Sequence, residues 1–81
     1  MPDRLLIVDD EEALRDQLSG HFRRAGYEVA TAGSGREALE KAAAGPDLIL
    51  LDVRLPDMGG LEVCRRVRRG GAVALLCVPR L

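Results

Sequence analysis

The sequence predicts an α/β fold in which helices cover both faces of a parallel sheet. Two continuous apolar runs, residues 5–8 and 48–51, each end in a carboxylate. Apolar runs of this length, without polar alternation, are typical of strands that are buried on both faces. Segments with helical periodicity lie between the runs and the connections are short, so we expect right-handed strand–helix–strand units within one sheet.

The spacing of apolar residues predicts a helix over residues 11–25. The members of its apolar stripe recur at intervals of four, four and three: Leu14, Leu18, Phe22 and Ala25. Arg15, Asp16 and Arg23 are expected to point away from that stripe. Gly26 stands where a left-handed cap would end the helix. Residues 27–32 have the aromatic and β-branched character of a second strand, which Gly33-Ser34-Gly35 ends.

A second helix is predicted over residues 36–44. Ser34 and Glu37 have the spacing of a capping box, in which the serine hydroxyl accepts a hydrogen bond from a helix amide and the glutamate reaches back. Gly45-Pro46 ends this helix, because proline disfavours helical geometry in the residue before it. The apolar run at 48–51 then forms the third strand.

The last third of the chain predicts a loop, a short helix and a strand. The loop covers residues 53–60 and contains Pro56 and Gly59-Gly60. Leu61, Cys64 and Val67 share one face of the following helix, which Gly70-Gly71 closes. Residues 73–78 are apolar and predict a fourth buried strand.

Length and composition favour a single globular domain over residues 1–81. Apolar residues make up 47% of the chain and charged residues 31%. The net charge of −1 gives no overall basic field, so we expect no direct contact with nucleic acid. A basic block of four arginines, Arg65, Arg66, Arg68 and Arg69, is interpreted as solvated helix surface.

The sequence favours a cytoplasmic location. It has neither a run of membrane-spanning length nor the apolar core and cleavage site of a secretory signal. Cys64 and Cys77 are not at metal-binding spacing and fit buried apolar positions, so we expect reduced core cysteines.

Three aspartates are the strongest candidates for a functional site. Asp9-Asp10 and Asp52 follow two buried strands, and in an open α/β sheet ligands bind beyond the carboxyl ends of the strands. If the two strands are neighbours, the carboxylates converge and repel one another unless a cation or proton offsets the charge. Hard oxygen ligands favour Mg²⁺ or Mn²⁺, and a carboxylate beside such an ion can act as a nucleophile toward a phosphoryl group. Alternatively, these acids only flank helix N-termini, where the helix dipole stabilises negative charge.

Three motifs resemble the receiver domains of two-component response regulators. They are Leu6-Ile7-Val8-Asp9-Asp10-Glu11, Asp47-Leu48-Ile49-Leu50-Leu51-Asp52 and Leu55-Pro56-Asp57-Met58-Gly59-Gly60, and the resemblance runs from Arg4 to Val78. It implies a doubly wound, flavodoxin-like parallel sheet with strand order 2-1-3-4-5, of which four strands are expected here. It also implies that Asp52 accepts phosphate from a histidine kinase. Asp10 would bind Mg²⁺ directly, Asp9 through water, and Arg54 through its backbone carbonyl.

The sequence departs from that family at two functional positions. Cys77 occupies the place of a serine or threonine hydroxyl at the end of the fourth strand, so the switch hydroxyl is expected to be absent. The family's phosphate-pairing lysine has no counterpart, since the only lysine is Lys41, in the second helix. The last strand–helix unit of the family is also missing, which predicts an apolar edge at residues 73–78. We therefore expect self-association through that strand or through the helix at 11–25.

Three functions follow from this pattern. The first is a signalling module, not an enzyme, that accepts a phosphoryl group on Asp52 from a histidine kinase or a small phosphodonor. The second is a degenerate receiver that acts only by binding other proteins. The third, a phosphatase of the haloacid-dehalogenase type, would use an aspartate two residues after the nucleophile, where this chain has Arg54.

Overall fold

The computed structural model describes residues 3–52 and 59–69, and the backbone of residues 74–78. Its elements follow in strict alternation along the chain: β1 (Arg4–Val8), α1 (Glu12–Arg24), β2 (Glu28–Ala32), α2 (Gly35–Ala42), β3 (Leu48–Asp52), α3 (Gly60–Arg69) and β4 (Ala74–Val78). All strand pairs are parallel. The predicted α/β fold is therefore confirmed.

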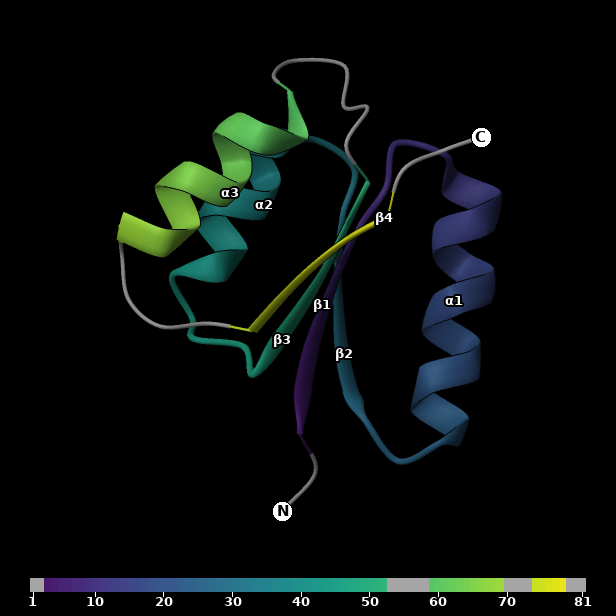
Figure 1. The fold of residues 1–81 in the computed structure, drawn as a ribbon. Helices are drawn as coiled ribbons and strands as arrows, with labels where there is room; N and C mark the ends of the chain where they lie inside the picture. Colours follow the sequence, from purple (N-terminus) through teal and green to yellow (C-terminus); the bar gives the residue numbers. More distant parts are fainter. Residues whose placement is uncertain (1–2, 53–58, 70–73, 79–81) are drawn as a thin grey trace.

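The four described strands lie in the order β2-β1-β3-β4. The chain first moves from β1 outward to β2, and then crosses back over β1 to β3. Helices α2 and α3 cover one face of the sheet and α1 covers the other (Figure 1). This doubly wound arrangement places the reversal of strand order between β1 and β3. In their register, Val8 of β1 lies opposite Leu51 of β3, so the two strands end at nearly the same level.

The hydrophobic core lies between the sheet and helices α2 and α3. Its members alternate along β1 and β3 and meet one apolar side of each helix: Leu6, Val8, Ala32, Ala38, Ile49, Leu51, Val63 and Val67. Burial of this apolar surface is the main source of stability in such a small domain. No helix in the described part of the chain has the length and apolar character needed to cross a membrane.

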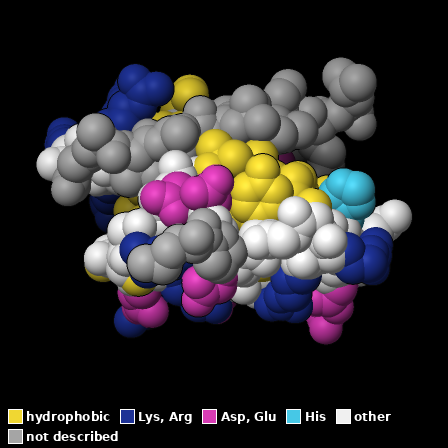
Figure 2. Space-filling view, turned by 90° about the horizontal axis from the view of Figure 1, so that it is seen from below, with side chains coloured by type: hydrophobic (Ala, Val, Ile, Leu, Met, Phe, Trp, Pro, Cys, Tyr) yellow, Lys and Arg dark blue, Asp and Glu magenta, His cyan; other side chains and the backbone are white. Residues whose placement is uncertain are grey.

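The opposite face of the sheet is less completely covered. Leu5 and Ile7 are buried there, whereas the stripe of α1, formed by Leu14, Leu18 and Phe22, is only half-buried. Leu48 and Leu50 of β3 are also half-buried. Seen from below, hydrophobic side chains gather at the surface beside the single histidine (Figure 2). Apolar surface thus remains accessible on the α1 side.

The C-terminus of α1 has a Schellman-type ending, and it corrects one prediction. Gly26 has a φ of 100°, as its predicted capping role requires, and its N–H donates to Arg23 O while Tyr27 N–H donates to Phe22 O. The rings of Phe22 and Tyr27 pack edge to face across this cap, 5.7 Å apart. Ala25 was wrongly assigned to the apolar stripe. It follows the last helical residue and is exposed, because the cap turns the chain away from the sheet.

Helix α2 begins with the predicted capping contacts. The Ser34 hydroxyl accepts a hydrogen bond from Glu37 N–H at 3.2 Å, and a Glu37 carboxylate oxygen accepts one from Gly33 N–H at 2.8 Å. The helix ends at Ala42, two residues earlier than predicted. Its last carbonyl oxygens accept hydrogen bonds from amides three residues further along the chain, as in a 3₁₀ turn, and one of these runs from Gly45 N–H to Ala42 O. Gly45 then takes a φ of 76°.

The capping contacts predict a pH-dependent contribution of Glu37 to stability. The hydrogen bond from Gly33 N–H, and secondarily the Lys41 ammonium 3.0 Å away, hold the pKa of Glu37 below its ordinary value of 4.5. A carboxyl whose pKa is lowered by folding stabilises the protein above its unfolded pKa, and this contribution is lost as the pH falls through its folded pKa. Because the side chain is partly exposed, Glu37→Gln should cost roughly 0.5 kcal/mol at pH 7. Urea unfolding of both proteins should show that this cost disappears well below pH 4.5, and an equal cost in acid would contradict the assignment.

Candidate functional site

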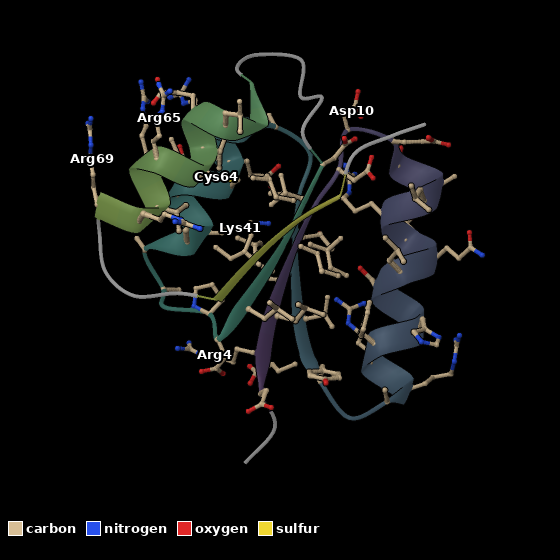
Figure 3. The ribbon with its side chains drawn as sticks, in the orientation of Figure 1. Arg4, Asp10, Lys41, Cys64, Arg65 and Arg69 are labelled. Carbon is tan, nitrogen blue, oxygen red and sulfur yellow. The ribbon has the colours of Figure 1, made fainter. Side chains whose placement is uncertain are left out.

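The three predicted aspartates meet at one end of the sheet. Asp52 is the last residue of β3, and Asp9 and Asp10 directly follow β1. One oxygen of each carboxylate can be chosen so that all three lie within 4.8 Å of one another. Asp9 and Asp52 are each only 6% exposed, whereas Asp10 is exposed at the rim, where Figure 3 labels it. The site therefore lies at the switch point between β1 and β3, as the strand-end pattern predicts.

Backbone amides and one arginine hold Asp9 in place. Its side chain accepts a hydrogen bond from Glu11 N–H at 2.9 Å, and its own N–H donates to Ala32 O of β2. Arg15 donates from Nη1 to the Asp9 carbonyl oxygen at 3.0 Å. These contacts tie the turn after β1 to both β2 and α1, so the carboxylate has a defined position before any ligand binds.

Arg15 was predicted only to point away from the apolar stripe of α1, and the structure gives it a specific contact. It is half-buried and bends back over the turn after β1. A Cβ atom on Gly33 would lie 2.7 Å from Arg15 Nη1, so glycine at that position leaves room for the guanidinium. The signal in the sequence was an arginine in the first turns of a helix directly after an acidic block, combined with a glycine after the second strand.

The charge of the site favours a divalent cation. Two unit charges at 4.8 Å repel by about 3 kcal/mol at an effective dielectric constant of about 20, and burial of two of the carboxylates strengthens this repulsion. A bound cation removes it. Carboxylate oxygens are hard ligands, and Mg²⁺ characteristically uses few of them and retains coordination positions for water and phosphate oxygens. The residues present therefore fit Mg²⁺ or Mn²⁺.

The other predicted site residues are placed only in part. Arg54 lies outside the described residues. Cys77 belongs to β4, where its backbone lies opposite Leu51, but its side chain is also outside the described part of the chain. Lys41 is held on α2, where its ammonium donates to Thr31 O and pairs with Glu37. Lys41 thus lies in the second helix, as predicted.

Comparisons with known proteins support one family. Residues 5–78 match the response regulator receiver domain. The alkaline phosphatase synthesis transcriptional regulatory protein PhoP of Bacillus subtilis is 49% identical over 70 residues, which are 85% of this chain and 29% of that protein. The response regulator MprA of Mycolicibacterium vanbaalenii is 47% identical over 72 residues, 88% of this chain and 31% of MprA. The chain thus spans about 30% of the length of these relatives.

Solved structures show the same fold. Chemotaxis protein CheY4 of Vibrio cholerae superposes with a TM-score of 0.89 at 38% identity, over 95% of this chain and 68% of that one. Response regulator protein TrrA of Thermotoga maritima, solved in complex with Mg²⁺–BeF, gives a TM-score of 0.82 at 39% identity, over 93% of this chain and 69% of TrrA. With the fold, the acidic switch-point site and these matches in agreement, the chain belongs to the receiver-domain family of two-component response regulators.

Proposed function

We propose that this chain receives a phosphoryl group on Asp52, from a histidine kinase or from a small phosphodonor, in a reaction that depends on Mg²⁺ or Mn²⁺. The observation that carries the proposal is the convergence of three carboxylates within 4.8 Å at the end of β3. The structure of the similar protein TrrA, solved in complex with Mg²⁺–BeF, supports it. The chain would act in the cytoplasm as a stoichiometric acceptor, not as an enzyme, and without direct contact to nucleic acid.

The proposed chemistry assigns a separate role to each carboxylate. An oxygen of Asp52 attacks the phosphorus, the bond from phosphorus to the donor breaks, and the donor leaves with the electron pair. Asp10 and Asp52 would hold the divalent ion directly, Asp9 through a water molecule, and Arg54 through its carbonyl oxygen. When bound, the ion supplies positive charge that stabilises the transferring oxygens. The hydrogen bond from Glu11 N–H keeps the Asp9 carboxylate oriented toward the site.

The surroundings of Asp52 support its proposed role as the acceptor. It ends a buried strand and is almost fully enclosed, so the sheet and the surrounding residues fix the position of its carboxylate. Asp10 is exposed at the rim, which suits a ligand that an incoming ion meets first. The exposed Asp10 beside the buried Asp52 favours an approach of the phosphodonor from the Asp10 side.

Incubation with acetyl phosphate and Mg²⁺ tests this proposal. We expect the intact protein to gain the mass of one phosphoryl group, and the gain to disappear in Asp52→Asn and when EDTA replaces Mg²⁺. Asp47→Asn, at an exposed position just before β3, is the matched control and should keep the gain. Phosphorylation that persists in Asp52→Asn would contradict the assignment.

A degenerate receiver that acts only by protein binding is the second candidate. It is favoured by the engagement of Lys41 with Thr31 and Glu37, which keeps the Lys41 ammonium from pairing with the phosphoryl group, and by cysteine at position 77. Loss of such a cation commonly costs a few kcal/mol, about 10²-fold or more in rate, at preorganised sites. This candidate predicts no mass gain even after prolonged incubation, although the three carboxylates would still bind Mg²⁺.

We also propose that the chain self-associates through β4 or through α1. Strand β4 is outermost among the four described strands, and the stripe of α1 formed by Leu14, Leu18 and Phe22 is half-buried. Both are surfaces that a second copy could cover. Sedimentation at micromolar concentration should show a dimer or larger species, and Leu18→Glu should dissociate it if α1 forms the contact. A monomeric wild-type protein with native helicity would contradict this proposal.

A further inference from the structure

Helix α3 presents a basic and apolar surface away from the core. Gly60, Val63 and Val67 are buried against the rest of the domain. The opposite side of the helix carries four residues that are all exposed, and we refer to them as the α3 outer face: Leu61, Arg65, Arg68 and Arg69. In Figure 3, the labelled Arg65 and Arg69 side chains project outward from α3.

The charge of the α3 outer face is not balanced by its surroundings. Glu62 is the only acidic residue of the helix, and it pairs with Arg66 at 3.5 Å. Within residues 3–52 and 59–69, the structure pairs no carboxylate with Arg65, Arg68 or Arg69. The chain as a whole has a net charge of −1, so this helix is a local basic region on an otherwise acidic protein.

An exposed leucine adjoins these arginines, so the prediction that Leu61 shares one apolar face with Cys64 and Val67 is wrong. Leu61 is 69% exposed, compared with 37% for Tyr27, the other large hydrophobic residue that is exposed in the described part of the chain. Leu61, Arg65 and Arg68 lie at i, i+4 and i+7 along α3, so they form one stripe. Arginines near a helix C-terminus also stabilise the helix dipole, which accounts for Arg68 and Arg69 but not for the exposure of Leu61 one turn before Arg65.

We propose that the α3 outer face docks an acidic helical segment of a partner protein. Arg65 and Arg69 are one turn apart, about 6 Å along the axis, which matches two glutamates one turn apart on a partner helix. Each guanidinium offers a planar fork to a carboxylate, and Leu61 offers an apolar contact beside it. A nucleic-acid backbone would use the arginines but would leave Leu61 without a complementary surface. Such a contact is weak and weakens further with salt, since its charges are exposed.

A helical peptide with glutamate and leucine at i, i+4 and i+7 spacing is a suitable probe. Its binding to the full chain can be followed by fluorescence anisotropy at low salt. We expect Arg65→Glu/Arg69→Glu to weaken binding at least tenfold, and Leu61→Ser to weaken it severalfold. Arg23→Glu/Arg24→Glu on α1 changes the net charge equally and should leave the affinity within twofold. Circular dichroism of each variant, with the wild-type spectrum as reference, separates loss of binding from loss of fold.

Three outcomes would overturn the proposal. The first is equal weakening by the α3 and α1 charge reversals, which would indicate attraction by net charge alone. The second is insensitivity of binding to Leu61→Ser, which would remove the apolar contact. The third is preferential binding of a single-stranded oligonucleotide or of anionic lipid vesicles over the peptide, which would assign the arginines to another class of partner.

Discussion

Replacing Asp9 with asparagine should raise the melting temperature of the metal-free protein by several degrees. The substitution removes one of three negative charges that lie within 4.8 Å, at a position that is almost fully buried. Asparagine retains an oxygen that can accept the hydrogen bond from Glu11 N–H, so the turn after β1 is preserved. We expect a net gain of about 1–2 kcal/mol, less than the pairwise Coulomb energies, because the exposed Asp10 is screened by solvent and an amide oxygen accepts the Glu11 hydrogen bond less strongly than a carboxylate. Each 1 kcal/mol shifts the melting temperature of a domain of this size by roughly 4–8 °C.

Mg²⁺ should narrow or reverse the difference in melting temperature between the Asp9→Asn variant and the wild-type protein. An ion that binds only the folded protein stabilises it in proportion to the logarithm of its concentration relative to Kd, and the wild-type protein should gain more than the variant. Thermal unfolding in EDTA and in millimolar Mg²⁺ measures both effects. Asp16→Asn, at an exposed position on α1, is the matched control and should change the melting temperature little in either buffer. A destabilised Asp9→Asn protein in EDTA would contradict the electrostatic account.

Truncation of Leu6 to alanine should remove a large part of the stability of the fold. Leu6 is 1% exposed and lies in the cluster between β1 and helices α2 and α3. Such a substitution in a packed core costs about 2–5 kcal/mol. A domain of this length has a total stability of roughly 4–12 kcal/mol, so the variant should be partly or wholly unfolded at 37 °C.

The matched control for Leu6 is Leu61, which is 69% exposed. Leu61→Ala removes the same atoms but should change the free energy of unfolding by less than about 0.5 kcal/mol. Urea unfolding followed by circular dichroism measures both. Equal costs for the two substitutions would show that the core does not lie where the structure places it.

The order and type of the elements could be predicted from the sequence largely because two of the strands, β1 and β3, are continuous apolar runs with clear ends. The runs at 5–8 and 48–51 are typical of strands that are buried on both faces, and each is followed by a carboxylate. Their ends come together once the sheet is parallel and the two strands are neighbours, which the register of β1 and β3 shows. The proximity of Asp9, Asp10 and Asp52 could therefore be predicted from the sequence.

What could not be predicted depends on contacts between distant segments. Periodicity predicts only that Arg15 points away from the apolar stripe, since it cannot represent a side chain that folds back onto the Asp9 carbonyl. The same periodicity extends the apolar stripe of α1 to Ala25, because the spacing of apolar residues does not show where the turn at Gly26 ends the helix. The partial burial of that stripe also depends on which elements cover it, a property of the assembled sheet and not of the helix itself.

Calorimetric titration of the metal-free protein with Mg²⁺ tests the central claim most directly. We expect binding of one ion per chain, weakened at least tenfold in Asp52→Asn and in Asp10→Asn, and unchanged in Asp16→Asn. The absence of any saturable Mg²⁺ binding to the folded wild-type protein, or equal binding by Asp52→Asn, would contradict it.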